Sequence, residues 1–151
     1  MNKLDILRKC DLFHGLTDEE LRVIEKLCTA KVFEAGAIIC KQGKALNKIH
    51  VIEEGLVGII REVGPLAQRQ VQAASKFDVV GWSALVEPRV CTATVKAIQR
   101  TKVLSFDKQD IDNLCSTHPE LGCKVSSGLA RVVARRLTEA YTQLLGVTYQ
   151  E

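Results

Sequence analysis

The sequence predicts one domain that is mainly β, with helices at both ends. Apolar residues recur at helical spacing in the first and last parts of the chain, and short apolar runs separated by glycines fill the middle. The 151 residues, 46% hydrophobic and 26% charged, suffice for one ordinary core. We therefore expect an N-terminal helical segment at 1–30, a β region at 31–106 and C-terminal helices at 107–151.

The N-terminal segment opens with a short helix near Leu4 and a tight apolar turn at 12–16. Thr17 and Glu20 then have the spacing of a capping box, in which the two residues satisfy each other's backbone N–H groups. The apolar residues that follow at helical spacing are Leu21, Ile24 and Leu27. Together these features predict a helix over about residues 17–28.

The β region consists of short strands punctuated by glycines, which adopt the positive φ of tight turns at little cost. The apolar strand cores lie at 32–33, 37–40, 49–52 and 57–60, and later strands are expected at 68–74, 91–97 and 102–106. Seven or eight short strands at this spacing are typical of a jelly-roll-like β-roll.

The C-terminal part is predicted to be helical. Asp107 is placed to cap a helix that runs through Leu114, and Pro119 suits the first turn of a second helix. An apolar stripe then follows at helical spacing: Leu121, Val125, Leu129, Val132, Leu137, Ala140, Leu144 and Leu145. We expect this stripe to be half core and half interface.

Several classes of function are not indicated. The net charge of +3 is mild and its basic residues are spread along the chain, which argues against a nucleic-acid-binding domain. No catalytic nucleophile motif or phosphate-binding P-loop occurs, so we expect no enzyme activity. The three histidines lack metal-site spacing, and no metal or required cofactor is expected.

The location is expected to be cytoplasmic. No apolar run is long enough to span a bilayer, and charges interrupt the N-terminus where a secretion signal needs an apolar core. The six cysteines include no Cys-x-x-Cys pair, so reduced thiols are expected.

Residues 77–97 carry the most informative motif. They contain the turn Gly81-Trp82-Ser83-Ala84, a loop with Pro88 and Arg89, and the segment Cys91-Thr92-Ala93-Thr94 that enters a strand. This stretch resembles the phosphate-binding cassette of the cyclic-nucleotide-binding domain family, of the catabolite activator protein and protein kinase A regulatory subunit type. The runs at 12–16, 33–36, 40–43 and 49–55 also resemble family motifs, so the resemblance extends from Leu12 to Leu145.

The resemblance implies a ligand site with a degenerate cassette. In the family, an acidic residue after the glycine takes the ribose 2′-hydroxyl and a later arginine clamps the cyclic phosphate. Here Trp82 and Cys91 stand at those two positions, and Arg89 lies two residues before Cys91, within reach if the loop register shifts. The predicted ligand-binding residues are Gly81, Trp82, Ser83, Ala84, Arg89, Cys91, Thr92 and Ala93.

The leading hypothesis is a stand-alone regulatory module that binds cyclic AMP, cyclic GMP or a similar small anion and relays binding through its C-terminal helices. The resemblance implies a homodimer through the last helix. A protein partner is expected to receive the output, and no membrane attachment is expected because no apolar run is long enough to span a bilayer. No DNA-binding domain is expected, because the sequence ends at Glu151. Two alternatives are a degenerate, non-binding dimeric interaction scaffold and a haem or redox sensor that uses His50 or Cys91.

Overall fold

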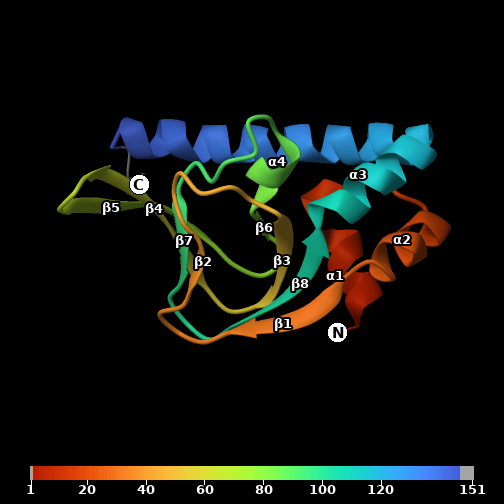
Figure 1. The fold of residues 1–151 in the computed structure, drawn as a ribbon, viewed down its shortest axis with the longest axis horizontal. Coiled ribbons are helices and arrows are strands. Elements are labelled where there is room, and N and C mark those ends of the chain that lie inside the picture. Colours follow the sequence, from red (N-terminus) through yellow and green to blue (C-terminus); the bar gives the residue numbers. More distant parts are fainter. Residues whose placement is uncertain (1, 147–151) are drawn as a thin grey trace, which may run out of the picture.

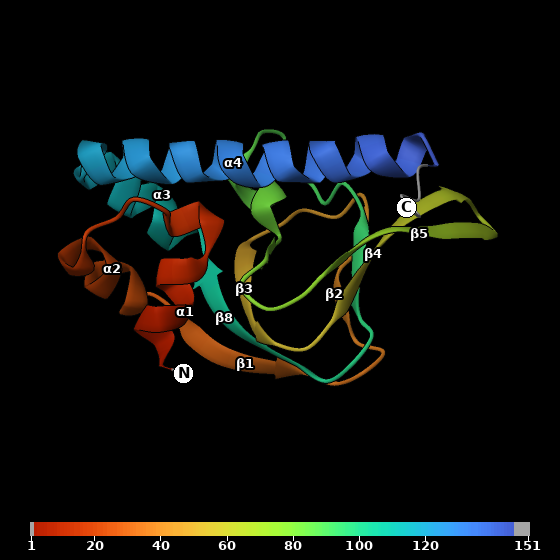
Figure 2. The same ribbon diagram turned by 180° about the vertical axis from the view of Figure 1, so that it is seen from behind.

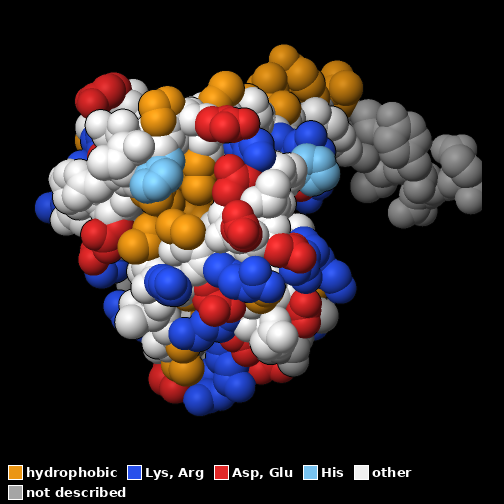
Figure 3. Space-filling model, turned by 90° about the vertical axis from the view of Figure 1, so that its right-hand side faces the viewer, with side chains coloured by type: hydrophobic (Ala, Val, Ile, Leu, Met, Phe, Trp, Pro, Cys, Tyr) orange, Lys and Arg blue, Asp and Glu red, His pale blue; other side chains and the backbone are white. Residues whose placement is uncertain are grey.

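The computed structural model describes residues 2–146 and has the predicted architecture, a β-roll flanked by helices. Figure 1 shows the roll at one end of the molecule, the short N-terminal helices at the other, and one long helix that lies across both. Figure 2 shows the same arrangement from behind. Figure 3 views the helical end, where basic and acidic side chains are interspersed and no patch of one sign dominates.

The N-terminal helices are α1 (Lys3–Lys9), the 3₁₀ turn η1 (Asp11–Phe13) and α2 (Asp18–Glu25). The predicted capping box is present at the start of α2. The Thr17 backbone N–H donates to Glu20 Oε1 at 2.9 Å, and the Glu20 N–H donates to Thr17 Oγ1 at 3.2 Å. The helix ends three residues earlier than predicted, because the chain turns at Lys26 and enters a strand at Thr29.

The described residues form eight strands in two antiparallel sheets. One sheet has the order β1-β8-β3-β6, and the other has the order β2-β7-β4-β5. The strands are β1 (Thr29–Phe33), β2 (Ile38–Cys40), β3 (Lys48–Glu54), β4 (Val57–Gly64), β5 (Ala67–Ala74), β6 (Val79–Val80), β7 (Thr94–Ala97) and β8 (Thr101–Asp107). Buried residues from both sheets pack together inside the roll: Ile52, Val57, Ala74, Val80, Val95 and Val103.

Two helices follow the roll, α3 (Lys108–Thr117) and α4 (Pro119–Leu144). Pro119 occupies the first turn of α4, as predicted. Asp107 directly precedes α3, as predicted, but the predicted capping is wrong because its side chain accepts no hydrogen bond from the helix. Its carboxylate instead pairs with Lys48 Nζ on the neighbouring strand, 2.8 Å away.

The N-terminal half of α4 is packed into the core. Its buried residues are Leu121, Gly122, Val125, Gly128 and Val132. At Gly128 the helix lies directly against η1, and a Cβ atom there would collide with the Leu12 backbone carbonyl. This contact fixes the position of α4 on the molecule, and the rest of the helix extends from that point over the open side of the roll.

Candidate ligand-binding site

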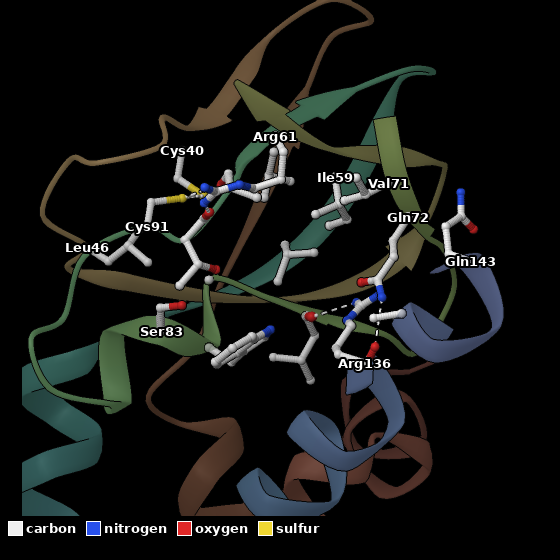
Figure 4. Close-up of a pocket in the computed structure, with 18 of the residues that line it drawn as sticks. Cys40, Leu46, Ile59, Arg61, Val71, Gln72, Ser83, Cys91, Arg136 and Gln143 are labelled. Carbon is white, nitrogen blue, oxygen red and sulfur yellow. Dashed lines mark hydrogen bonds between the residues drawn. The ribbon is translucent and has the colours of Figure 1, made fainter. Parts of the chain in front are cut away.

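A cavity of about 640 Å³ lies between the second sheet, the turn after β6 and the C-terminal half of α4. Figure 4 shows side chains from these three parts of the fold pointing into it. Its lining residues are Cys40, Leu46, Ile59, Arg61, Arg69, Val71, Gln72, Val79, Val80, Gly81, Trp82, Ser83, Cys91, Thr92, Ala93, Val95, Arg136, Ala140, Gln143 and Leu144. A cavity of this volume is typical of small-molecule sites.

The turn after β6 requires glycine. Gly81 has φ of +79°, in the left-handed region, and a Cβ atom there would lie 2.7 Å from the Lys48 carbonyl oxygen. The chain then enters the single 3₁₀ turn η2 (Trp82–Leu85), and Figure 4 shows the Ser83 side chain at the cavity edge. The glycine thus lets the backbone approach β3 closely and bring Ser83 to the cavity.

The structure brings together six of the eight residues predicted to bind ligand. The six that line the cavity are Gly81, Trp82, Ser83, Cys91, Thr92 and Ala93. Ala84 is instead fully buried in the core. Arg89 does not line the cavity either: its Nη1 donates to Asp112 Oδ2 on α3 at 2.7 Å and its Nε to Glu87 at 3.2 Å.

Three arginines line the cavity that sequence analysis did not single out. Arg61 lies on β4, Arg69 on β5 and Arg136 on α4, and among the described lining residues there is no Asp or Glu. Arg61 and Arg69 face each other directly in the register of the β4–β5 pair. Within residues 2–146, neither of them forms an ion pair with a carboxylate.

Two of these arginines are held by backbone carbonyls. The Arg61 guanidinium donates to the carbonyl of Thr92, in the cassette segment. On the opposite side of the cavity, Arg136 Nη2 donates to the Val79 carbonyl at 3.2 Å, and the Arg136 carbonyl accepts from Gln72 Nε2 at 2.8 Å. Positive charge is therefore fixed at two sides of the cavity, and α4 is tied to both β5 and β6.

Two thiols also meet at the cavity wall. The sulfur atoms of Cys40 and Cys91 are 3.2 Å apart. The contact between the two thiols lowers the pKa of the Cys91 thiol to about 7, while the pKa of Cys40 is raised by the same contact and by burial. A thiol with a pKa near neutrality is partly ionised at physiological pH.

His50, the other residue of the haem hypothesis, lies away from the cavity. It is 4% exposed, and its Nδ1 is 2.7 Å from Ser105 Oγ on the neighbouring strand. Burial lowers its pKa to about 4. Across the described residues, no three His, Cys, Asp or Glu side chains gather as a metal site would require, and no helix is long and apolar enough to cross a bilayer.

The two antiparallel sheets and their flanking helices form a β-roll whose arginine-lined cavity has the size of a small-molecule site. Residues 30–118 match the family model described as the cyclic nucleotide-binding domain, and the chain belongs to that family. The family is regulatory rather than catalytic.

The sequence relatives are longer regulatory and channel proteins. The cyclic AMP receptor protein of Thermus thermophilus is 25% identical over 140 residues, which cover 93% of this chain and 63% of that protein. The cAMP-dependent protein kinase regulatory subunit of Schizosaccharomyces pombe is 28% identical over 109 residues, which cover 72% of this chain and 26% of that protein. A cyclic nucleotide-gated potassium channel of Mesorhizobium japonicum is 30% identical over 114 residues, which cover 73% of this chain and 29% of that protein. The chain spans less than two thirds of the length of each.

Solved structures share the same fold. A cyclic nucleotide-binding domain from Methylobacillus flagellatus superimposes with a TM-score of 0.84 at 20% identity, covering 98% of this chain and 83% of that one. The catabolite activator protein of Thermus thermophilus superimposes with a TM-score of 0.74 at 25% identity, covering 89% of this chain and 61% of that one. These similarities extend over the roll and over the helices that flank it.

Proposed function

We propose that the cavity binds a small anion of the cyclic-nucleotide type and that α4 converts binding into a change of helix packing. The observation that carries this proposal is the pair of arginines, Arg61 and Arg69, which face each other across β4 and β5 at a cavity that no carboxylate from residues 2–146 lines. Like charges directly opposite in a sheet are destabilising. An anionic guest between the two guanidinium groups relieves that repulsion.

Arg61 is proposed to take the role of the missing cassette arginine. Cys91 stands at the family's arginine position, and Arg61 reaches the same segment from β4 through its hydrogen bond to the Thr92 carbonyl. Arg89 is already engaged by Asp112 and Glu87 and lies outside the lining. A guanidinium pairs well with a phosphate because its N–H groups match two oxygens at once.

The cavity differs from the family pattern at the ribose. Trp82 replaces the acidic residue that takes the 2′-hydroxyl in the family, and no carboxylate among the residues that the structure describes lines the cavity. A ribose 2′-hydroxyl therefore adds little binding free energy in this cavity, while the apolar side chains of the lining suit a nucleotide base. We expect cyclic AMP and its 2′-deoxy analogue to bind with affinities within about twofold of each other, since no charge-assisted hydrogen bond is lost.

The relay is proposed to run through α4. Arg136, Ala140, Gln143 and Leu144 on this helix line the cavity, so a guest contacts the helix directly. The bonds that tie Arg136 to Val79 and Gln72 are adjacent to the guest and compete with it. A ligand that binds one position of α4 better than another shifts the population toward that position.

The exposed apolar residues at the end of α4 support the proposed homodimer. Leu137 is 49% exposed, Tyr141 57% and Leu144 83%. Leu144 both lines the cavity and faces outward, so a guest and a second copy of the chain are proposed to share this part of the helix. A change in α4 would then alter self-association or binding of a protein partner.

Calorimetry with cyclic AMP and cyclic GMP tests the proposal on the wild-type chain and on two variants. Arg61→Ala is expected to lose about 10- to 150-fold in affinity, the effect of removing a charge-assisted hydrogen bond. Arg89→Ala, in which the removed arginine lies outside the cavity, is the matched control and is expected to bind as the wild type does. Absence of heat with either nucleotide at millimolar concentration would favour the non-binding scaffold instead.

A further inference from the structure

Cys40 and Cys91 form a dithiol inside the cavity that the family role does not explain. Their sulfur atoms are 3.2 Å apart although the residues are 51 positions apart in the sequence. All six cysteines are free thiols, and these two are the ones that line the cavity. Figure 4 shows them together on the side of the cavity that carries Arg61.

Hydrogen bonds hold the segment after Cys40 against the segment that contains Cys91. The Cys91 N–H donates to the Lys44 carbonyl and its carbonyl accepts from the Gly43 N–H, both at 2.9 Å. The Gln42 N–H donates to Thr94 Oγ1 at 3.0 Å on the other side. Because a disulfide bond is about 2.05 Å long, the sulfur atoms need to approach by only about 1.1 Å.

We propose that Cys40 and Cys91 are a thiol–disulfide modification site that reacts with a hydroperoxide, and that its closure regulates anion binding in the cavity. The second half of this proposal rests on the proposed function, and the first half does not. A hydroperoxide suits the site because Cys91 is only 5% exposed, so the co-reactant must be small enough to enter the cavity.

The reaction balances with hydrogen peroxide. The Cys91 thiolate attacks one peroxide oxygen, the O–O bond breaks, and hydroxide leaves and takes up the proton that the thiol released. Cys91 is then a sulfenic acid. Cys40 sulfur attacks Cys91 sulfur, the S–S bond forms, the S–O bond breaks, and the oxygen leaves as water with the Cys40 proton. Two thiols are oxidised and one peroxide is reduced to two waters.

The electrostatics of the cavity give the modification a consequence. The charged groups that line it are Arg61 from β4, Arg69 from β5 and Arg136 from α4, so a Cys91 thiolate is the negative charge that competes with an anionic guest. The disulfide is neutral. Because the contact with Cys40 lowers the pKa of Cys91, the thiolate is more abundant at pH 8 than at pH 6, and the reduced protein is expected to bind an anion more weakly than the oxidised protein at pH 8. At pH 6 the difference is expected to be smaller.

The modification is tested first by mass spectrometry on the folded chain treated with hydrogen peroxide. We expect a peptide that links Cys40 to Cys91, with the loss of two hydrogen atoms, in the wild type and in the control Cys123→Ser, which removes an exposed thiol. Cys91→Ser and Cys40→Ser are expected to give no such peptide. Retention of both thiols, or oxidation of Cys91 to a sulfinic acid without a cross-link, would overturn the proposal.

Calorimetry with cyclic AMP on the reduced and the oxidised protein, at pH 6 and pH 8, tests the regulatory half. Tighter binding by the oxidised form, with a larger difference at pH 8 than at pH 6, supports it, and equal or weaker binding by the oxidised form at pH 8 would overturn it. Should neither form bind cyclic AMP while the cross-link is present, the proposed function fails and the modification site stands.

Discussion

The two halves of α4 have opposite surroundings. The half up to Val132 is packed into the core and lies so close to η1 that position 128 has room only for glycine. The half from Arg136 onward lines a cavity on one side and exposes Leu137 and Tyr141 on the other. One helix therefore has an anchored half, which depends on packing, and a half that lines the cavity, which we call the sensing half because the proposed function places the response to a guest there.

The largest expected effect lies in the anchored half. Gly128→Ala places a methyl group against the Leu12 backbone carbonyl. The clash can be relieved only if α4 or η1 shifts, and either shift would disturb the core. We expect the free energy of unfolding to fall by about 3 kcal/mol, the upper end for overpacking. Urea unfolding measures it. The neighbouring exposed position supplies the control, since Ser127→Ala is expected to change stability by less than about 0.5 kcal/mol.

The second prediction concerns acid sensitivity of the sheet beneath the anchored half. The folded-state pKa of His50 is about 4, below the model-peptide value of 6.5, because burial disfavours the charged ring. Below pH 6.5 the unfolded chain binds the proton more readily, so stability falls as the pH drops from 6.5 to 4, by up to about 3 kcal/mol. Unfolding curves across this range measure the loss.

A His50→Gln variant sharpens the test because it cannot titrate. Its stability at pH 7 is expected to be lower than that of the wild type, and the part of the acid loss due to His50 is expected to vanish. An unchanged slope between pH 6.5 and pH 4 would show that other groups cause the acid sensitivity.

The third prediction concerns the sensing half. Ala140 is exposed and lines the cavity, so Ala140→Trp fills space that a guest needs without disturbing the core. We expect at least about a tenfold loss of cyclic AMP affinity, equivalent to about 1.4 kcal/mol, and stability within about 0.5 kcal/mol of the wild type. Equal affinity in the variant would place the guest elsewhere.

The smallest effect on stability is expected at the outward face of the sensing half. The double variant Leu137→Ser, Tyr141→Ser removes two exposed apolar side chains and is expected to change the free energy of unfolding of the monomer by less than about 0.5 kcal/mol. Sedimentation is expected to show a dimer for the wild type and a monomer for the variant. Thr138→Ala, on the same helix, serves as the control and is expected to remain dimeric.

The parts of the fold that short stretches of sequence encode were predictable. The capping box at Thr17 and the helix start at Pro119 were confirmed because each depends on residues within one helical turn. The glycine at 81 was informative for the same reason, since only glycine allows the turn it makes against Lys48.

The arginine pair and the dithiol were beyond local patterns. Arg61 and Arg69 become neighbours through the register of β4 and β5, and a bulge in that register breaks the alternation that would have indicated it. Cys40 and Cys91 meet across the pairing of segments far apart in the sequence. Asp107 directly precedes a helix, the position of a capping residue, but its carboxylate pairs with Lys48 on the adjacent strand and does not accept a hydrogen bond from the helix.

The hydrogen bond between Arg61 and the Thr92 carbonyl has a thermodynamic consequence. A long, rotamer-rich side chain normally loses about 0.5–1.5 kcal/mol of conformational entropy when a ligand immobilises it. In this protein that loss has occurred during folding, before any guest arrives. If the cavity binds an anion as proposed, its affinity benefits in advance from the strand pairing that positions the guanidinium.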